Sequence, residues 1–130
     1  MARNGLGKET ARQRRLRILI VDDNLDQVHT MAYLLTDMGH HVDYAINGIV
    51  ALELAQRTRP EVVLLDVRLP DATGLQIARQ LRRYPELKDT PIVGVTGFPF
   101  DEKEALAAGL SQVLAKPVDF AMLEGLLDRL

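Results

Sequence analysis

Five short, mostly apolar runs divide the sequence, and each is followed by a segment whose apolar residues recur with helical spacing. The strand-like runs are 17–21, 41–45, 62–66, 91–95 and 113–115. The helix-like segments are 25–38, 49–57, 73–83, 101–108 and 119–130. Strands and helices that alternate in this way predict an α/β protein, with a parallel sheet covered by helices on both faces.

The order of the strands can be predicted from how apolar they are. Runs 17–21, 62–66 and 91–95 are the most apolar, which is typical of central strands buried on both faces. Five strands of this kind fit the flavodoxin-like order 2-1-3-4-5, a three-layer (βα)5 sandwich. A chain of 130 residues forms one domain. We therefore predict a single domain over residues 16–130, preceded by a flexible basic leader or linker over residues 1–15.

The N-terminal segment differs from the rest of the chain in its charge. Residues 1–17 contain one acidic residue, Glu9, and six basic residues, namely Arg3, Lys8, Arg12, Arg14, Arg15 and Arg17. Basic arms can bind nucleic acid, but here no aromatic residues are interleaved with the charges. We interpret the segment as a solvated leader or linker, and we expect the domain not to bind nucleic acid directly.

Composition excludes several classes of function. The sequence contains no cysteine, which rules out disulfides, thiolate metal sites and a cysteine nucleophile. No apolar run approaches the roughly 18 residues of a membrane span. The N-terminus has no apolar signal region. These features predict a cytoplasmic protein that does not contact membranes.

Polar residues stand where four of the predicted strands end. Asp22 and Asp23 follow the first run, Asp66 ends the third, Thr96 follows the fourth and Lys116 follows the fifth. The carboxyl ends of parallel strands meet at one edge of a sheet, so these side chains should converge. Three carboxylates around one ammonium group need a further cation if all are to stay ionised. An all-oxygen ligand set of this kind suits Mg²⁺.

Such a cluster is suited to phosphoryl transfer. A carboxylate can act as a nucleophile and carry the phosphoryl group as an acyl phosphate. The transfer requires mainly that charge on the phosphoryl oxygens be neutralised. Mg²⁺ on Asp22 and Asp23, the Lys116 ammonium, the Thr96 hydroxyl and nearby loop amides could do so. Asp66 is then the candidate nucleophile.

Four sequence motifs carry a family resemblance. The motifs are Val21-Asp22-Asp23-Asn24, Asp66-x-x-x-Pro70-x-x-x-Gly74, Val95-Thr96-Gly97 and Lys116-Pro117. Their order and spacing resemble those of the bacterial response-regulator receiver domain of two-component systems, of the chemotaxis-regulator type, over roughly residues 16–130.

The resemblance implies a role for each acidic residue. Asp66 would accept a phosphoryl group from a histidine kinase or a histidine phosphotransfer protein. Asp23 and Asp66 would ligate Mg²⁺ together with the main-chain carbonyl of Arg68, and Asp22 would act mainly through water. Such a domain is a phosphoacceptor switch in a phosphorelay, and it catalyses only its own phosphorylation and dephosphorylation.

The resemblance also implies how the phosphoryl group is held. Thr96 and Lys116 would bind its oxygens, and the backbone N–H groups of Val67 and Gly97 would donate to them. The change would then spread to the face formed by the segments 101–108, 113–115 and 119–130, where an output partner or a second copy would bind.

Two features depart from the common family pattern. The family often has Tyr or Phe three residues before the lysine, where this chain has Val113. An output route that does not use a rotating aromatic side chain is therefore expected. Arg68 and Phe98 occupy the two positions that flank the phosphoryl group in the family, and we hypothesise that this bulky pair shields it from water.

Other interpretations of the same residues are available. Asp22 and Asp23 could simply cap the following helix, and the domain could be a degenerate receiver that serves only as a protein-interaction module. A Mg²⁺-dependent aspartyl-phosphate phosphatase is a second alternative, but such enzymes carry Asp-x-Asp after the first strand. A flavin or nucleotide site would need a Gly/Ser/Thr-rich loop there instead of an acidic one. We interpret Asp71 as a loop residue and the histidines as surface or structural residues.

Overall fold

The computed structural model describes residues 15–69, 71–97 and 101–130 of the chain. Pro70 of the second sequence motif lies outside the described residues. So do two sequence-based expectations, the flexibility of the leader up to residue 14 and the position of Phe98 beside the site. They stay predictions.

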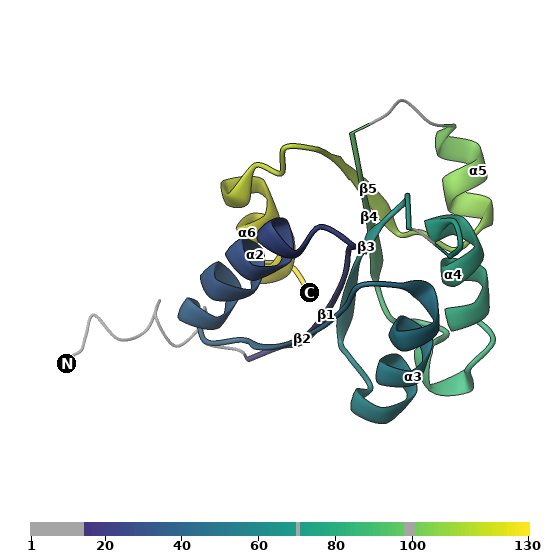
Figure 1. The fold of residues 1–130 in the computed structure, drawn as a ribbon, viewed down its shortest axis with the longest axis horizontal. Coiled ribbons are helices and arrows are strands. Elements are labelled where there is room, and N and C mark those ends of the chain that lie inside the picture. The colour runs from purple at the N-terminus through teal and green to yellow at the C-terminus, as the bar shows by residue number, and fades with distance from the viewer. Residues whose placement is uncertain (1–14, 70, 98–100) are drawn as a thin grey trace.

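A five-stranded parallel sheet forms the centre of the domain (Figure 1). Its strands are β1 (Arg17–Val21), β2 (His41–Ala45), β3 (Val62–Asp66), β4 (Ile92–Thr96) and β5 (Gln112–Ala115). They are ordered β2-β1-β3-β4-β5, and each neighbouring pair is parallel. Every residue of β3 and β4 is buried, whereas β2 at one edge is partly exposed. The predicted flavodoxin-like order is therefore confirmed.

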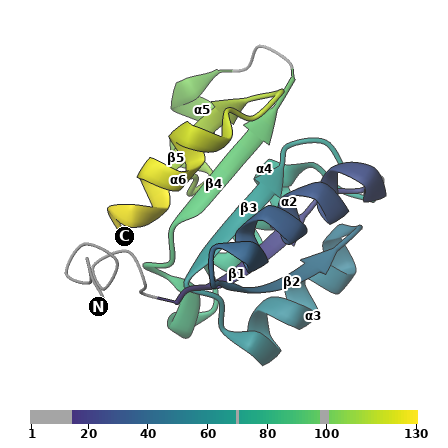
Figure 2. The ribbon, with the colours of Figure 1, turned by 90° about the vertical axis from the view of Figure 1, so that its left-hand side faces the viewer.

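Helices cover both faces of the sheet and make three layers (Figures 1 and 2). One face carries α2 (Leu25–Asp37) and α6 (Phe120–Asp128). The other carries α3 (Gly48–Thr58), α4 (Gly74–Leu81) and α5 (Glu102–Ala107). The core is divided accordingly into two apolar clusters, one on each side of the sheet.

Side-chain caps fix where several helices start. The Asn24 side chain accepts the Gln27 N–H at the start of α2. Thr73 and Gln76 form a reciprocal capping box at the start of α4. Asp119 accepts two N–H groups at the start of α6. Because these caps fix where each helix starts, α2 begins directly after the acidic pair, and the Asp22–Asp23 turn is held at the sheet edge.

The connection between α4 and β4 differs from the prediction. It contains a short 3₁₀ helix, η1 (Pro85–Leu87), between the predicted helix 73–83 and the predicted strand 91–95, where no element was expected. Proline suits the first position of such a turn because it has no N–H, and an N–H at that position would have no partner within the helix. The last helix also ends at Asp128, two residues before the predicted end.

Within the described residues, no helix is both long enough and apolar enough to span a membrane.

Candidate functional site

The strand register brings the predicted polar residues to one edge of the sheet. Asp66 pairs with Val95, the residue before Thr96. Thr96 in turn pairs with Ala115, the residue before Lys116. The ends of β3, β4 and β5 therefore present Asp66, Thr96 and Lys116 side by side.

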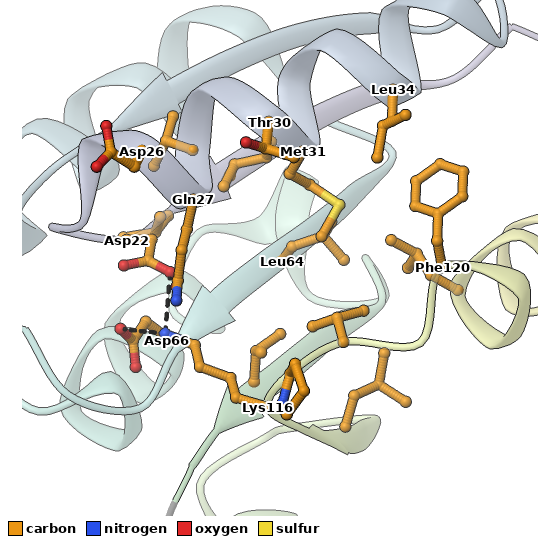
Figure 3. A pocket seen from close by; sticks show the side chains of 18 residues that line it. Asp22, Asp26, Gln27, Thr30, Met31, Leu34, Leu64, Asp66, Lys116 and Phe120 are labelled. Atoms are coloured by element: carbon orange, nitrogen blue, oxygen red, sulfur yellow. Dashed lines mark hydrogen bonds and ion pairs between the residues drawn. The ribbon is translucent and has the colours of Figure 1, made fainter.

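A lysine bridges two carboxylates at the centre of this edge (Figure 3). The Lys116 Nζ lies 3.1 Å from Asp22 Oδ2 and 3.1 Å from Asp66 Oδ2. The remaining oxygen of Asp22 accepts the Asn24 N–H at 2.9 Å. That of Asp66 accepts the Arg68 N–H at 2.9 Å. Each carboxylate is therefore oriented by one charged partner and one backbone amide.

Burial strengthens the electrostatics of this cluster. Asp66 is 7% exposed. This burial, together with the negative charge of Asp22, raises the pKa of its carboxyl group more than the Arg68 N–H and the Lys116 ammonium lower it. Burial lowers the pKa of Lys116, but its hydrogen bonds to Asp22 and Asp66 and the negative charges of these two carboxylates together outweigh that effect, so the net shift is upward. The lysine stays charged at neutral pH, and the Asp66 carboxylate is short of compensating positive charge.

Three carboxylates could hold a metal ion here. Asp22, Asp23 and Asp66 each offer an oxygen, and these atoms all lie within 4.8 Å of one another. Asp23 is exposed while the other two are buried, so the cluster is accessible from solvent. The oxygen-only set and the excess of negative charge fit Mg²⁺ better than a softer metal.

The two residues whose backbone N–H groups are expected to contact a phosphoryl group, Val67 and Gly97, have different surroundings. The Val67 N–H donates to the Val95 carbonyl at 3.1 Å and so extends the sheet. Contact with a phosphoryl oxygen would require it to leave this partner. Gly97 is exposed at the end of β4, and a Cβ built on it would lie 3.8 Å from Lys116 Cβ. The buried Thr96 accepts the Lys116 N–H through its own carbonyl at 2.8 Å.

A mostly apolar cavity of about 330 Å³ adjoins the cluster. Met31 of α2, Leu64 of β3 and Phe120 of α6 contribute to its apolar wall, and Asp66 and Lys116 lie at its polar end (Figure 3). Gln27, also among the lining residues, points from α2 toward the charged cluster (Figure 3). The site is thus continuous with a groove on the α2–α6 side of the sheet.

Val113 has a structural role in the core. It is half-buried, lies opposite Gly94 in the sheet and packs against the apolar cluster on the α3–α5 side. A side chain of this size fills the space without a polar group that would need a partner.

The histidines are structural or lie at the surface, as predicted. Buried His40 accepts the Leu16 N–H on its Nδ1 at 3.1 Å, and desolvation lowers its pKa. His41 lies 3.4 Å from Asp43 on β2, and the His29 ring packs edge-on against Tyr44.

Sequence analysis missed the contact made by Asp71. Its Oδ1 accepts the Gly48 N–H at 2.8 Å and its Oδ2 accepts the Ile49 N–H at 3.2 Å. Asp71 is a loop residue as expected, but it also ties the loop after β3 to the start of α3. The partners lie more than twenty residues away in the chain, so no local pattern could have indicated them.

Comparison with known proteins identifies the class that this fold and site define. The sequence model of the response regulator receiver domain matches residues 18–128. The chain therefore belongs to the response-regulator receiver family. Receiver domains are the phosphoacceptors of two-component signalling, where they interact with histidine kinases or phosphotransfer proteins.

Relatives of this chain include parts of sensor proteins and also separate regulators, such as the Polar-differentiation response regulator DivK of Brucella anthropi, which is 31% identical over 78% of this chain and 84% of DivK. The Aerobic respiration control sensor protein ArcB of Escherichia coli K12 is 37% identical over 116 residues, which cover 88% of this chain. The match covers only 15% of ArcB, so this chain corresponds to a small part of that protein.

Two solved structures are also similar. Chemotaxis protein CheY4 of Vibrio cholerae is 32% identical with a TM-score of 0.83, and the match covers 89% of this chain and 98% of CheY4. The receiver domain of sensor histidine kinase PA1611 of Pseudomonas aeruginosa PAO1 is 31% identical with a TM-score of 0.81, covering 89% and 97%. That structure has a magnesium ion coordinated in its active-site cleft.

Proposed function

We propose that Asp66 is the residue of this receiver domain that accepts the phosphoryl group. The observation that carries the proposal is the shared lysine: Lys116 Nζ lies 3.1 Å from both Asp22 and Asp66. Of these two aspartates, Asp66 ends the central strand β3 and its pKa is raised by burial. A carboxylate short of positive charge beside a solvent-accessible acidic cluster is suited to carrying a phosphoryl group with a cation.

The transfer step follows from this geometry. The P–N bond of a phosphohistidine donor breaks and its electron pair leaves with the imidazole, while a P–O bond forms to a carboxylate oxygen of Asp66. The Lys116 ammonium, now shared with Asp22, would then pair with a phosphoryl oxygen. The hydroxyl of Thr96, at the end of the neighbouring strand β4, would bind a second phosphoryl oxygen.

We propose Mg²⁺ as the cofactor. Asp23, Asp66 and the Arg68 carbonyl would hold it directly, and Asp22 would hold it mainly through water. When bound, the ion supplies positive charge that offsets the charge on the phosphoryl oxygens. The acidic cluster of this chain and the magnesium ion in the PA1611 receiver structure support the assignment.

Two backbone amides would complete the phosphoryl site. The Gly97 N–H at the end of β4 and the Val67 N–H would donate to phosphoryl oxygens. Because Val67 donates to Val95 in this structure, its participation implies that the first residue beyond β3 changes partner on phosphorylation. That change would be a local source of a conformational switch.

The donor would be a histidine kinase or a histidine phosphotransfer protein, and the output would pass through the face formed by α5, β5 and α6. An output partner or a second copy of the chain would bind there. With Val113 at the aromatic position, this route would rely on backbone shifts and packing at β5. The domain would act as a switch whose only reactions are its own phosphorylation and dephosphorylation.

The test is phosphorylation by a small donor. The protein is incubated with Mg²⁺ and acetyl phosphate and its intact mass is measured. We expect a gain of about 80 Da, the mass of one phosphoryl group, that is lost on treatment with base. Asp66→Asn should abolish the gain, while Asp43→Asn, which removes a carboxylate from the edge strand β2, should retain it. Labelling of Asp66→Asn, or none of the wild type, would overturn the assignment.

The same reaction separates the alternatives. A phosphatase would release inorganic phosphate from excess acetyl phosphate in many turnovers, with little labelled protein at any time. A degenerate receiver would neither take up nor release phosphate. The proposed switch accumulates one phosphoryl group per chain and loses it slowly once the donor is removed.

A further inference from the structure

The tip of the loop between β3 and α4 is bound to a different helix. Both oxygens of Asp71 accept backbone N–H groups at the start of α3, from Gly48 at 2.8 Å and from Ile49 at 3.2 Å. The first amides of a helix have no partner within the helix, so they bind such a carboxylate well. The Gly48 N–H, and to a smaller extent the Ile49 N–H, lower the pKa of Asp71. The contact is therefore made by the ionised group at neutral pH.

The base of the same loop is closed against Asp66. The Arg68 N–H donates to Asp66 Oδ1 at 2.9 Å, and Arg68 forms an isolated bridge with Thr73 across the loop. The Gly74 N–H donates to the Val67 carbonyl at 2.7 Å. The loop is thus held at its base beside the acceptor carboxylate and at its tip by Asp71.

The start of α3 does not depend on Asp71 for its own cap. The Asn47 side chain already accepts the Val50 N–H at 2.9 Å and serves as the helix N-cap. In addition, a Cβ at Gly48 would collide with Ile77 and lie 3.3 Å from Asp71 Oδ1. The side chains of Asn47 and Asp71 therefore both bind the first turn of α3, and of these two it is Asp71 that connects that turn to the loop beside the site.

We propose that Asp71 is a positioning residue for phosphorylation. By clamping the loop to α3, it would fix the backbone of Arg68, and with it the carbonyl that would face the cation beside Asp66. The inference rests on the proposed function of Asp66 and names a residue that acts on the site from outside it. The positioning role of Asp71 would therefore be measured as a contribution to the affinity of the site for the cation.

The test compares Asp71→Ala and Asp71→Asn with the matched control Asn47→Ala. The control removes a cap from the same turn of α3 but leaves the loop contact in place. Mg²⁺ alone is titrated and the dissociation constant is followed by backbone amide chemical shifts. Hydrogen exchange of the loop amides is measured in metal-free buffer.

We expect Asp71→Ala to weaken Mg²⁺ binding about tenfold, at the lower end of the effect of removing a residue that orients a metal ligand. Asp71→Asn keeps one acceptor oxygen and should show a smaller loss. Exchange of the loop amides should rise in both variants without metal. Phosphate uptake from acetyl phosphate should slow at low Mg²⁺ and recover at saturating Mg²⁺. Asn47→Ala should lower thermal stability and leave the Mg²⁺ affinity unchanged.

Two failures can be told apart. If the wild type takes up no phosphate, the proposed function of Asp66 is wrong, whatever the variants do. If the wild type is phosphorylated but the Asp71 variants bind Mg²⁺ as tightly as Asn47→Ala does, the positioning role is wrong and Asp71 only stabilises the fold. Should Asp71→Ala fail to fold, the near-isosteric Asp71→Asn decides the question.

Discussion

At the scale of single residues, the site contains charge that the fold would be more stable without. Asp22 and Asp66 are buried and share one ammonium group, so one negative charge is left over even before exposed Asp23 is counted. Positions of this kind commonly trade stability for function. The pKa of Asp66 is raised, which means that the folded state disfavours its charged form.

This predicts that Asp66→Asn stabilises the metal-free protein. Because the pKa of Asp66 is raised in the folded state above its ordinary value of 3.8, the folded protein holds the proton more tightly than the unfolded chain. Its favourable contribution is complete below that ordinary value and is lost as the pH rises through the raised pKa. Asparagine does not ionise and keeps the contribution.

Urea unfolding with a chelator present measures the effect. We expect Asp66→Asn to be more stable than the wild type by about 1 kcal/mol at pH 7, and the difference to shrink toward zero below pH 4. A wild type that is the more stable of the two at pH 7 would show that the Lys116 pairing outweighs burial.

Two glycines near the site should differ sharply when replaced by alanine. A Cβ at Gly74 would lie 2.5 Å from the Asp66 carbonyl oxygen and 2.6 Å from Val67 Cα, and neither backbone atom can move without disturbing β3. The nearest atom to a Cβ at Gly97 is 3.8 Å away. We expect Gly74→Ala to cost about 2 kcal/mol or more and Gly97→Ala about 0.5 kcal/mol or less in free energy of unfolding. Similar costs for both would contradict the close approach at Gly74.

At the scale of elements, local signals in the sequence were sufficient for most of the fold. Asn24, Thr73 and Asp119 cap helices at the places where their residue types and the following apolar spacing indicate. The four strand ends that carry the site follow from the βα rhythm together with the strand order. The caps and the alternation of strands and helices depend on neighbours in the chain, so the sequence displays them directly.

The features that could not be predicted depend on distant contacts. Asp71 reaches across 23 residues to Gly48, and the Val67 N–H is taken by the neighbouring strand. The η1 turn is supported by Arg82, whose guanidinium donates to carbonyls around η1 and to the Gly109 carbonyl after α5. A pattern of residue types along the chain contains no signal for partners of this kind.

Arg82 links the η1 turn to the segment after α5, so its removal should destabilise the fold. Its guanidinium donates to the carbonyls of Leu87, Lys88 and Thr90 around η1 and to that of Gly109 after α5. Arg82→Ala would leave several part-buried carbonyls without this partner, at a cost of about 2–3 kcal/mol in free energy of unfolding. Arg82→Lys cannot reproduce the planar set of donors and should recover only part of the loss.

Exposed Arg83, the next residue, supplies the matched control. Arg83→Ala should change the free energy of unfolding by about 0.5 kcal/mol or less. The measurement is chemical denaturation of the three variants beside the wild type. Equal effects of Arg82→Ala and Arg83→Ala would mean that the hydrogen bonds of Arg82 contribute little net stability.

At the scale of the whole molecule, cation binding and folding should be coupled through the acidic cluster. The carboxylates come from the ends of β1 and β3, and their oxygens come within 4.8 Å of one another only in the folded chain. A ligand that binds only the folded state stabilises it according to its concentration relative to the dissociation constant. Mg²⁺ at about one hundred times its dissociation constant should therefore add about 2.7 kcal/mol to the free energy of unfolding.

Asp23→Asn tests whether the acidic cluster is the origin of that stabilisation. Asp23 is exposed, so the substitution should change the stability of the metal-free protein by about 0.5 kcal/mol or less. It removes one of the three clustered carboxylates, and we expect the added stability from Mg²⁺ to be largely lost. Asp43→Asn, which removes a carboxylate of the edge strand β2, should keep the full effect. Equal stabilisation of both variants by Mg²⁺ would place the bound cation elsewhere on the molecule and separate metal binding from Asp66.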